Sequence, residues 1–232
     1  YLNFRRFAIV NAALMLGALA VVVQNGVPGR VHGNVFARSN PHKQILHVLS
    51  ACQHDRVGLS GVPCHLWGES DSSVRLAVWG DSHAYSLTSG MMQVLPGVPI
   101  DLLSASGCPS MLTFTRNDKP RICHSQQHSF QSWAWGEDAA DVVILSSRWV
   151  AMLNGPATDN GEGGVEQGSG LKYVPLDGRS LDTQEHIEAI LNDHAELVAK
   201  TLDHGKTVVL VYPVPEFGWN VPRESARRAW ME

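Results

Sequence analysis

Short apolar runs recur between residues 75 and 212, and each ends at a glycine, a serine or a proline. Four of them predict strands: Leu76–Trp79, Ile100–Leu103, Asp141–Leu145 and Thr207–Tyr212. Their residues are largely apolar at successive positions, which is typical of strands that are covered on both faces. Such strands predict a mostly parallel sheet inside the domain.

Helical spacing fills the intervals between these strands. Ala84–Leu95 and Ser125–Ala140 are predicted helices. A third helix is the clearest, because apolar residues recur three and four positions apart between Asp182, which can form a capping box with Glu185, and Gly205, a typical C-terminal stop. Strands and helices that alternate in this order predict a three-layered α/β domain.

An uncharged apolar run, Phe7–Val23, follows Arg5 and Arg6. It has about the length of a membrane span and lacks the polar stripe of a surface helix, with a buried core helix as the alternative. A signal peptide fits less well, because the chain opens on Tyr1 and the residues after the run make a poor cleavage site. The positive-inside rule then places the two arginines in the cytoplasm and the chain after Gln24 outside.

This apolar run divides the chain into three parts. We expect residues 1–25 to be a transmembrane helix, residues 26–50 a linker with a short helix, and residues 51–232 the folded domain. A chain that opens without methionine just before a membrane helix is expected to be a piece of a longer protein.

The four cysteines form an even set, as expected for an extracytoplasmic domain with disulfides. Their order favours Cys52 with Cys64 and Cys108 with Cys123, although four cysteines allow three connectivities. Zinc is a weaker alternative, because histidines flank the cysteines but no strong ligand spacing is present. We therefore expect disulfides and no bound metal.

Charge and glycine content exclude two further classes of function. The formal net charge of -4 shows none of the basic excess of a nucleic-acid-binding protein. The glycine-rich stretch 154–170 lacks the spacing of a phosphate-binding loop and predicts a surface loop, which could act as a lid. We expect neither a nucleic-acid partner nor a cofactor.

The tetrapeptide Gly80-Asp81-Ser82-His83 lies where the first predicted strand turns into the first predicted helix. Reactive groups in parallel sheets gather at the carboxyl ends of the strands. At a helix start, free backbone N–H groups and the helix dipole favour developing negative charge, as a serine nucleophile requires. Asp81 and Ser82 are also favoured N-cap residues, so a purely structural cap is the competing interpretation.

Several segments, in the right order, resemble one enzyme family. Val78–Leu87 (VWGDSHAYSL) is similar to the first block of SGNH hydrolases, in the form found in SGNH domains fused behind acyltransferase-3 membrane domains. Ser106–Pro109 resembles the second block, Asp141–Trp149 the strand ending in Arg-Trp at the third-block position, and Val211–Glu216 a later strand and loop. Gly26–Arg30 is similar to the junction between the two parts. The resemblance implies an SGNH-hydrolase-like, flavodoxin-like three-layer fold preceded by one transmembrane helix.

The resemblance also implies roles for individual residues. Ser82 would be the nucleophile, and the backbone N–H of Gly107 would help to bind the oxyanion. Arg148 stands near the position of an oxyanion-binding asparagine in ordinary members, although an ordinary structural arginine is an equal interpretation. The family's final Asp-x-x-His, which supplies the base, does not follow Tyr212, so we expect a truncated domain that is weakly active or inactive. His83 is badly oriented for this role, and surface or structural roles are expected for His186, His194 and His204.

The function implied is O-acyl transfer, most simply of acetyl, to a cell-surface carbohydrate. A membrane domain would deliver the acyl donor across the lipid bilayer, and the SGNH domain would act outside the bacterial cytoplasmic membrane, in the periplasm. A carbohydrate esterase with the same serine is one alternative. A non-catalytic carbohydrate-binding module is the other.

Overall fold

The computed structural model describes residues 63–66, 74–136, 139–154, 159, 161 and 173–212. All of them belong to one compact unit, Pro41–Trp219. The predicted transmembrane helix, the linker and short helix that follow it, nearly all of the glycine-rich loop and residues 213–232 lie outside the described residues. Within the described ranges, no helix is long and apolar enough to cross a membrane.

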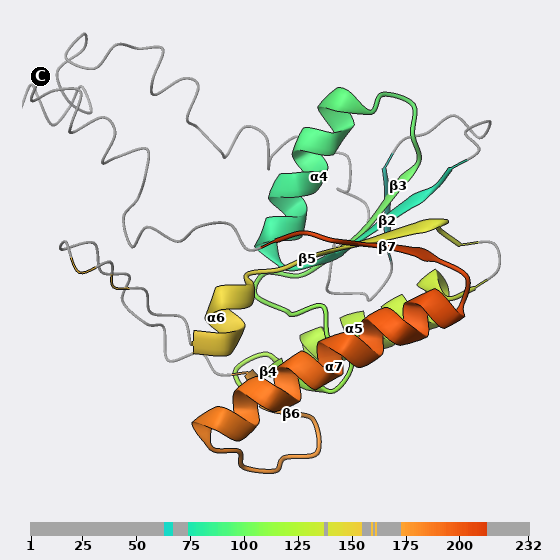
Figure 1. The fold of residues 1–232 in the computed structure, drawn as a ribbon. Coiled ribbons are helices and arrows are strands. Elements are labelled where there is room, and N and C mark those ends of the chain that lie inside the picture. Colours follow the sequence, from blue (N-terminus) through green and yellow to red (C-terminus); the bar gives the residue numbers. More distant parts are fainter. Residues whose placement is uncertain are drawn as a thin grey trace, which may run out of the picture. The chain divides into compact units, whose positions relative to one another are not determined.

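Helices and strands alternate along most of the described chain (Figure 1). The strands are β1 (Cys64–Leu66), β2 (Leu76–Gly80), β3 (Ile100–Ser104), β4 (Phe114–Arg116), β5 (Val142–Ser146), β6 (Tyr173–Pro175) and β7 (Thr207–Leu210). The helices are α4 (Ser82–Val94), α5 (Pro120–Ala134), α6 (Trp149–Asn154) and α7 (Thr183–Asp203).

The central sheet has the order β1-β3-β2-β5-β7. The strand β2 lies in its middle, and Val78 pairs with Leu102 of β3 and Ile144 of β5. The pairs β2–β3, β2–β5 and β5–β7 are parallel, whereas β1 runs antiparallel to β3. The predicted mixed α/β domain with a mainly parallel sheet is confirmed.

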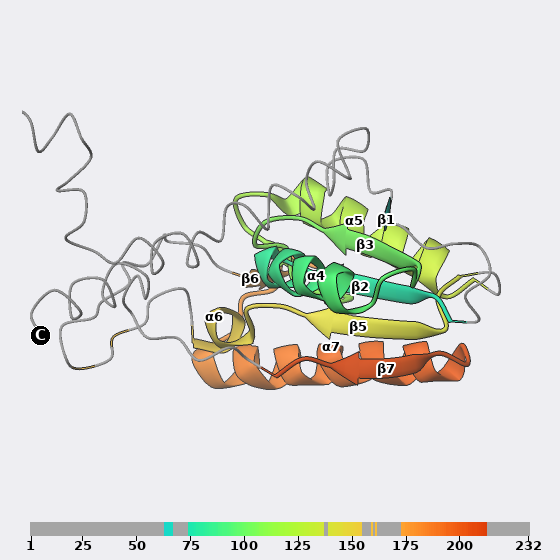
Figure 2. The same cartoon turned by 90° about the horizontal axis from the view of Figure 1, so that it is seen from above.

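Helices cover both faces of this sheet (Figures 1 and 2). One face packs against α4, where Val78, Leu102 and Ile144 meet Ala84. The other face packs against α5 and α7, and there Trp79 stacks on Phe130 with ring centroids 4.0 Å apart. The carboxyl ends of the parallel strands therefore open between two helical layers, where ligands of such folds bind.

Two predicted helix boundaries need correction. The helix α5 spans Pro120–Ala134 rather than Ser125–Ala140, because a proline at its first position sets the start and Trp135 caps its end. The helix α4 starts at Ser82, two residues earlier than predicted, because Asp81 is its N-cap. For α7 the predicted capping box of Asp182 and Glu185 is confirmed, and Gly205 follows its end with a φ of 73°.

A second sheet of two strands was not predicted. The strands β4 and β6 pair in antiparallel register, with Arg116 directly opposite Tyr173. Each strand is only three residues long, and their partners are far apart in sequence, so hydrophobic periodicity gives no signal for them. This small sheet lies outside the central one and supports the loop that follows β3, as shown below.

Candidate active site

Ser82 is the first residue of α4, and its side chain is exposed to solvent. The N-cap role falls to Asp81, whose Oδ1 accepts the backbone N–H of His83 at 2.8 Å. The two interpretations of the tetrapeptide therefore apply to different residues, because Asp81 caps the helix and leaves the Ser82 hydroxyl unused for capping. Within the described residues, the backbone N–H of Ser82 has no hydrogen-bond partner.

Asp81 is buried and connects the ends of three parallel strands. Its Oδ2 accepts the backbone N–H of Arg148 at 2.9 Å, just beyond β5. Its backbone carbonyl accepts the hydroxyl of Ser104, the last residue of β3, at 2.6 Å. Burial raises the pKa of the Asp81 carboxyl, while its bonds to two backbone N–H groups oppose that rise.

Gly80, the last residue of β2, allows the strand ends to approach closely. A Cβ at this position would overlap the backbone carbonyl oxygen of Ser146, its register partner on β5. Only glycine fits this contact without moving the backbone. The first block therefore places Ser82 at the carboxyl end of the central strand, as the sequence predicted.

Gly107 lies in a tight turn after β3. The N–H of Cys108 bonds to the carbonyl of Ala105 at 2.9 Å, and Gly107 has a φ of 73°, a conformation that favours glycine. Among the described residues, the N–H of Gly107 has no hydrogen-bond partner. This donor is thus available to a ligand, which is what an oxyanion-binding role requires.

The disulfide between Cys108 and Cys123 fixes the same turn to α5. The local pairing predicted for these two cysteines is confirmed, which excludes Cys123 as a zinc thiolate. Cys64 is also disulfide-bonded, and its expected partner, Cys52, lies outside the described residues. Over the part of the chain that the structure describes, no three histidine, cysteine or acidic side chains gather as a metal site.

Arg148 directly follows the buried pair Ser146 and Ser147 at the end of β5. Its backbone N–H holds Asp81, as described, and its side chain is half-buried. Burial raises the pKa of Asp81 and that of Tyr173, and the positive charge of Arg148 opposes part of both rises. The third-block position therefore lies at the same end of the sheet as Ser82, whereas a direct contact of Arg148 with substrate stays a prediction.

Four residues that support this region lie outside the sequence motifs of the family. The buried amide of Gln126 donates to the carbonyls of Gly80 and Leu103, each at 3.1 Å. The buried Asp193 of α7 accepts the backbone N–H groups of Leu112 and Thr113, at 2.8 and 2.6 Å. Two further side chains, Arg116 and Tyr173, bond to the turn of Gly107. Their contacts join residues between 10 and 81 positions apart, so no helical or strand periodicity could have found them.

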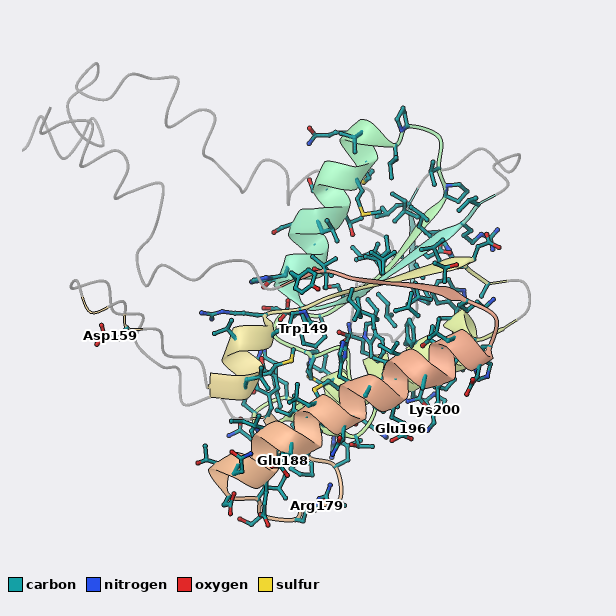
Figure 3. The ribbon with its side chains drawn as sticks, in the orientation of Figure 1. Trp149, Asp159, Arg179, Glu188, Glu196 and Lys200 are labelled. Carbon is teal, nitrogen blue, oxygen red and sulfur yellow. A yellow bond between two sulfur atoms is a disulfide. The ribbon has the colours of Figure 1, made fainter. Side chains whose placement is uncertain are left out.

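The histidines of α7 are engaged elsewhere. His186 bonds to the carbonyl of Met152 at 3.3 Å, and His194 packs its ring 4.3 Å from that of Trp149, which Figure 3 shows at the start of α6. His204 stacks on Trp135. No hydrogen bond joins a described histidine side chain to Ser82, and these contacts agree with the structural roles expected for the three residues.

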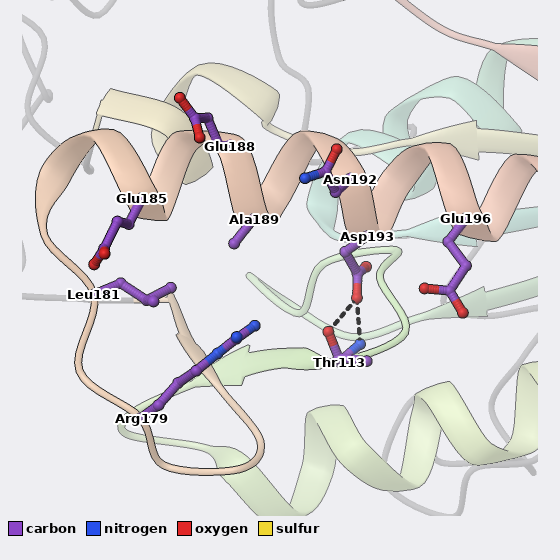
Figure 4. Close-up of a pocket in the computed structure, with 9 residues that line it drawn as sticks. All are labelled: Thr113, Arg179, Leu181, Glu185, Glu188, Ala189, Asn192, Asp193 and Glu196. Carbon is purple, nitrogen blue, oxygen red and sulfur yellow. Dashed lines mark hydrogen bonds between the residues drawn. The ribbon is translucent and has the colours of Figure 1, made fainter.

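Two hollows lie beside α7, away from Ser82. The larger, of about 460 Å³, is rich in carboxylates and is shown in Figure 4, with the Asp193–Thr113 contact at one side and Arg179 reaching in from the other. The second, of about 430 Å³, lies between α6, β6 and the start of α7. Ser82, Gly107 and Arg148 line neither hollow, so both are separate from the candidate site.

The sequence itself matches a known family over most of its length. The family of SGNH domains fused to AT3 domains matches residues 51–232. The chain therefore belongs to this family of SGNH domains, whose hydrolase-like fold indicates acyl-transfer or esterase chemistry in general. No curated protein and no solved structure matches the chain.

Proposed function

We propose that this domain transfers an acyl group, most simply acetyl, to a hydroxyl of a cell-surface carbohydrate through Ser82. The observation that carries the proposal is the position of two backbone donors and one hydroxyl at the carboxyl end of β2 and β3. The N–H groups of Ser82 and Gly107 have no partner within the described residues, and the Ser82 side chain is exposed to solvent. Family membership supports this class of chemistry.

In the proposed reaction, the Ser82 oxygen attacks the carbonyl carbon of the acyl donor while a base takes the hydroxyl proton. The carbonyl oxygen becomes negatively charged and is stabilised by the N–H groups of Ser82 and Gly107 and by the α4 dipole. Collapse breaks the bond to the leaving group, which takes up a proton. A sugar hydroxyl then attacks the acyl-serine, and the products are a sugar ester and the regenerated Ser82.

The acyl donor, in this proposal, comes from a membrane domain, and the acceptor lies outside the cytoplasmic membrane. The disulfide between the buried residues Cys108 and Cys123 supports an oxidising compartment such as the periplasm. Arg148 is proposed to add positive charge at the site. Water in place of the sugar would make the same domain an esterase.

The test compares the full-length protein with its variant Ser82→Ala. We expect the variant to lose acyl transfer to surface polysaccharide by a factor of roughly 10³ or more, because the proposed acyl-serine cannot form without the Ser82 hydroxyl. The matched control is Ser132→Ala, an exposed serine of α5, which should keep wild-type activity. Acylation of the polysaccharide is measured by mass spectrometry, and acetate release separates transfer from hydrolysis. Unchanged acylation in Ser82→Ala would favour a binding module.

A further inference from the structure

Two side chains of the small sheet bind the backbone of the Gly107 turn. Nη1 of Arg116 donates to the carbonyl of Ser106 at 2.9 Å, and the hydroxyl of Tyr173 donates to the carbonyl of Gly107 at 3.3 Å. Arg116 and Tyr173 are direct register partners on β4 and β6. One pair of opposite residues therefore binds two consecutive carbonyls of the turn.

The first of these carbonyls belongs to the peptide unit that carries the Gly107 N–H. A trans peptide is planar, so its C=O and N–H point in opposite directions. A donor that fixes the Ser106 carbonyl on one side therefore fixes the direction of the Gly107 N–H on the other. Hydrogen bonding at the carbonyl also polarises the peptide and makes its N–H a stronger donor.

Arg116 is itself held in one orientation. Its Nε and Nη2 form a two-point contact with the Asp118 carboxylate, at 2.8 and 2.7 Å. The side chain of Arg116 is only 7% exposed, and a Cβ on Gly107 would overlap the guanidinium, which shows how closely the two pack. A guanidinium stays charged in proteins, so a fixed positive charge lies directly behind the turn.

Tyr173 restrains the next peptide unit. Burial raises the pKa of Tyr173 to about 12, so the hydroxyl keeps its proton and can donate to the Gly107 carbonyl. Its hydrogen bond to Gly107 places this hydroxyl at the turn that follows β3.

We infer that Arg116 and Tyr173 are positioning residues that aim the Gly107 N–H at the oxyanion formed on Ser82. Asp118 assists by orienting Arg116. This inference rests on the proposed function, because it assigns a supporting role to residues behind the proposed oxyanion donor. Neither side chain touches the substrate, and both act through the backbone of the turn.

The experiment measures hydrolysis of 4-nitrophenyl acetate by the full-length protein and by three variants, Arg116→Lys, Tyr173→Phe and Asp118→Asn. We expect kcat to fall roughly 10- to 100-fold in Arg116→Lys and about tenfold in Tyr173→Phe, less than on direct loss of an oxyanion donor. In Asp118→Asn, kcat should fall about threefold. KM should stay within about twofold, because the lost interactions act in the transition state.

Controls separate this role from a structural one. Tyr85→Phe removes a hydroxyl from a half-buried tyrosine on α4 and should keep wild-type kcat. The thermal midpoint of each variant is recorded, and if Arg116→Lys fails to fold, Tyr173→Phe and Asp118→Asn, which keep the guanidinium, decide the question. Wild-type kcat in the folded variants overturns the inference. If Ser82→Ala hydrolyses the ester as fast as wild type, the proposed function and the inference fail together.

Discussion

The helix α7 and the loop 105–113 are stabilised in opposite ways. The helix carries its own supports: Asp182 and Glu185 close a capping box at its start, and Glu196 and Lys200, labelled on its outer side in Figure 3, form an ion pair one turn apart. The loop contains no helix or strand, and side chains from other elements bind its backbone or, in one case, form a disulfide with it. These side chains come from β4, β6, α5 and α7 and from the end of β5: Arg116, Tyr173, Cys123, Asp193 and Ser147.

This difference explains how a rigid site can exist without regular structure. Unpaired backbone groups in a buried segment cost free energy, so each needs a partner. In α7 the partners of the backbone groups are a few residues away, so these backbone hydrogen bonds do not require another element, although Ile190 and Leu197 pack into the core. In the loop the partners come from several different elements. The position of Gly107 therefore depends on how these elements pack together. Residues that bridge the two regions should therefore matter most.

Asp193 is the bridge, and its loss should have the largest effect on stability. Its carboxylate accepts two backbone N–H groups and the hydroxyl of Thr113, and Asp193→Ala would leave the N–H of Leu112 buried without a partner and remove both bonds that hold Thr113. We expect the free energy of unfolding to fall by about 2–4 kcal/mol, because one buried donor loses its partner and two further bonds to a charged group are lost. Chemical denaturation measures it, with Asn192→Ala, its exposed neighbour, as the matched control. A change below about 1 kcal/mol would show that the loop does not depend on α7.

The capping box of α7 should contribute less. We expect Asp182→Ala to lower the free energy of unfolding by about 1 kcal/mol, because one N-cap bond is lost at an exposed helix start. Turnover at Ser82 should not change. The eleven residues to Asp193 span about 16 Å of helix, so the effects of the two substitutions should add. Exposed Ser180→Ala, just before the helix, is the control, and a loss of turnover in Asp182→Ala would contradict the separation of the two regions.

The same contrast explains which features the sequence could predict. The strand ends at Gly80 and the helix caps at Asp182 and Gly205 follow from neighbouring residues, and the structure has them where the pattern placed them. Ser82 and Gly107 came from family motifs, whose geometry fits the proposed roles. Gln126 and Asp193, in contrast, look like ordinary polar helix residues. Their importance depends on which carbonyl or N–H the fold brings opposite them, and such pairings have no period along the chain.

The smallest expected effect concerns pH and the contact of α7 with Trp149. Burial lowers the pKa of His194 below its usual 6.5, against the opposing charge of Asp193. The unfolded chain therefore takes up this proton at a higher pH than the folded one. The stability that His194 contributes is complete above about pH 6.5 and is lost as pH falls toward the lower folded pKa.

We expect the free energy of unfolding to decrease by less than about 1 kcal/mol from this residue between pH 7 and pH 5, since the ring is only partly buried. In His194→Gln this part of the decrease should vanish, leaving a flatter stability profile over the same range. Asn192→Gln, at an exposed position of the same helix that carries no titrating group, is the matched control and should keep the wild-type slope. Equal slopes in wild type and His194→Gln would mean that the imidazole packed on Trp149 titrates alike in the folded and unfolded states, and that α7 contributes no pH-dependent contact to this end of the sheet.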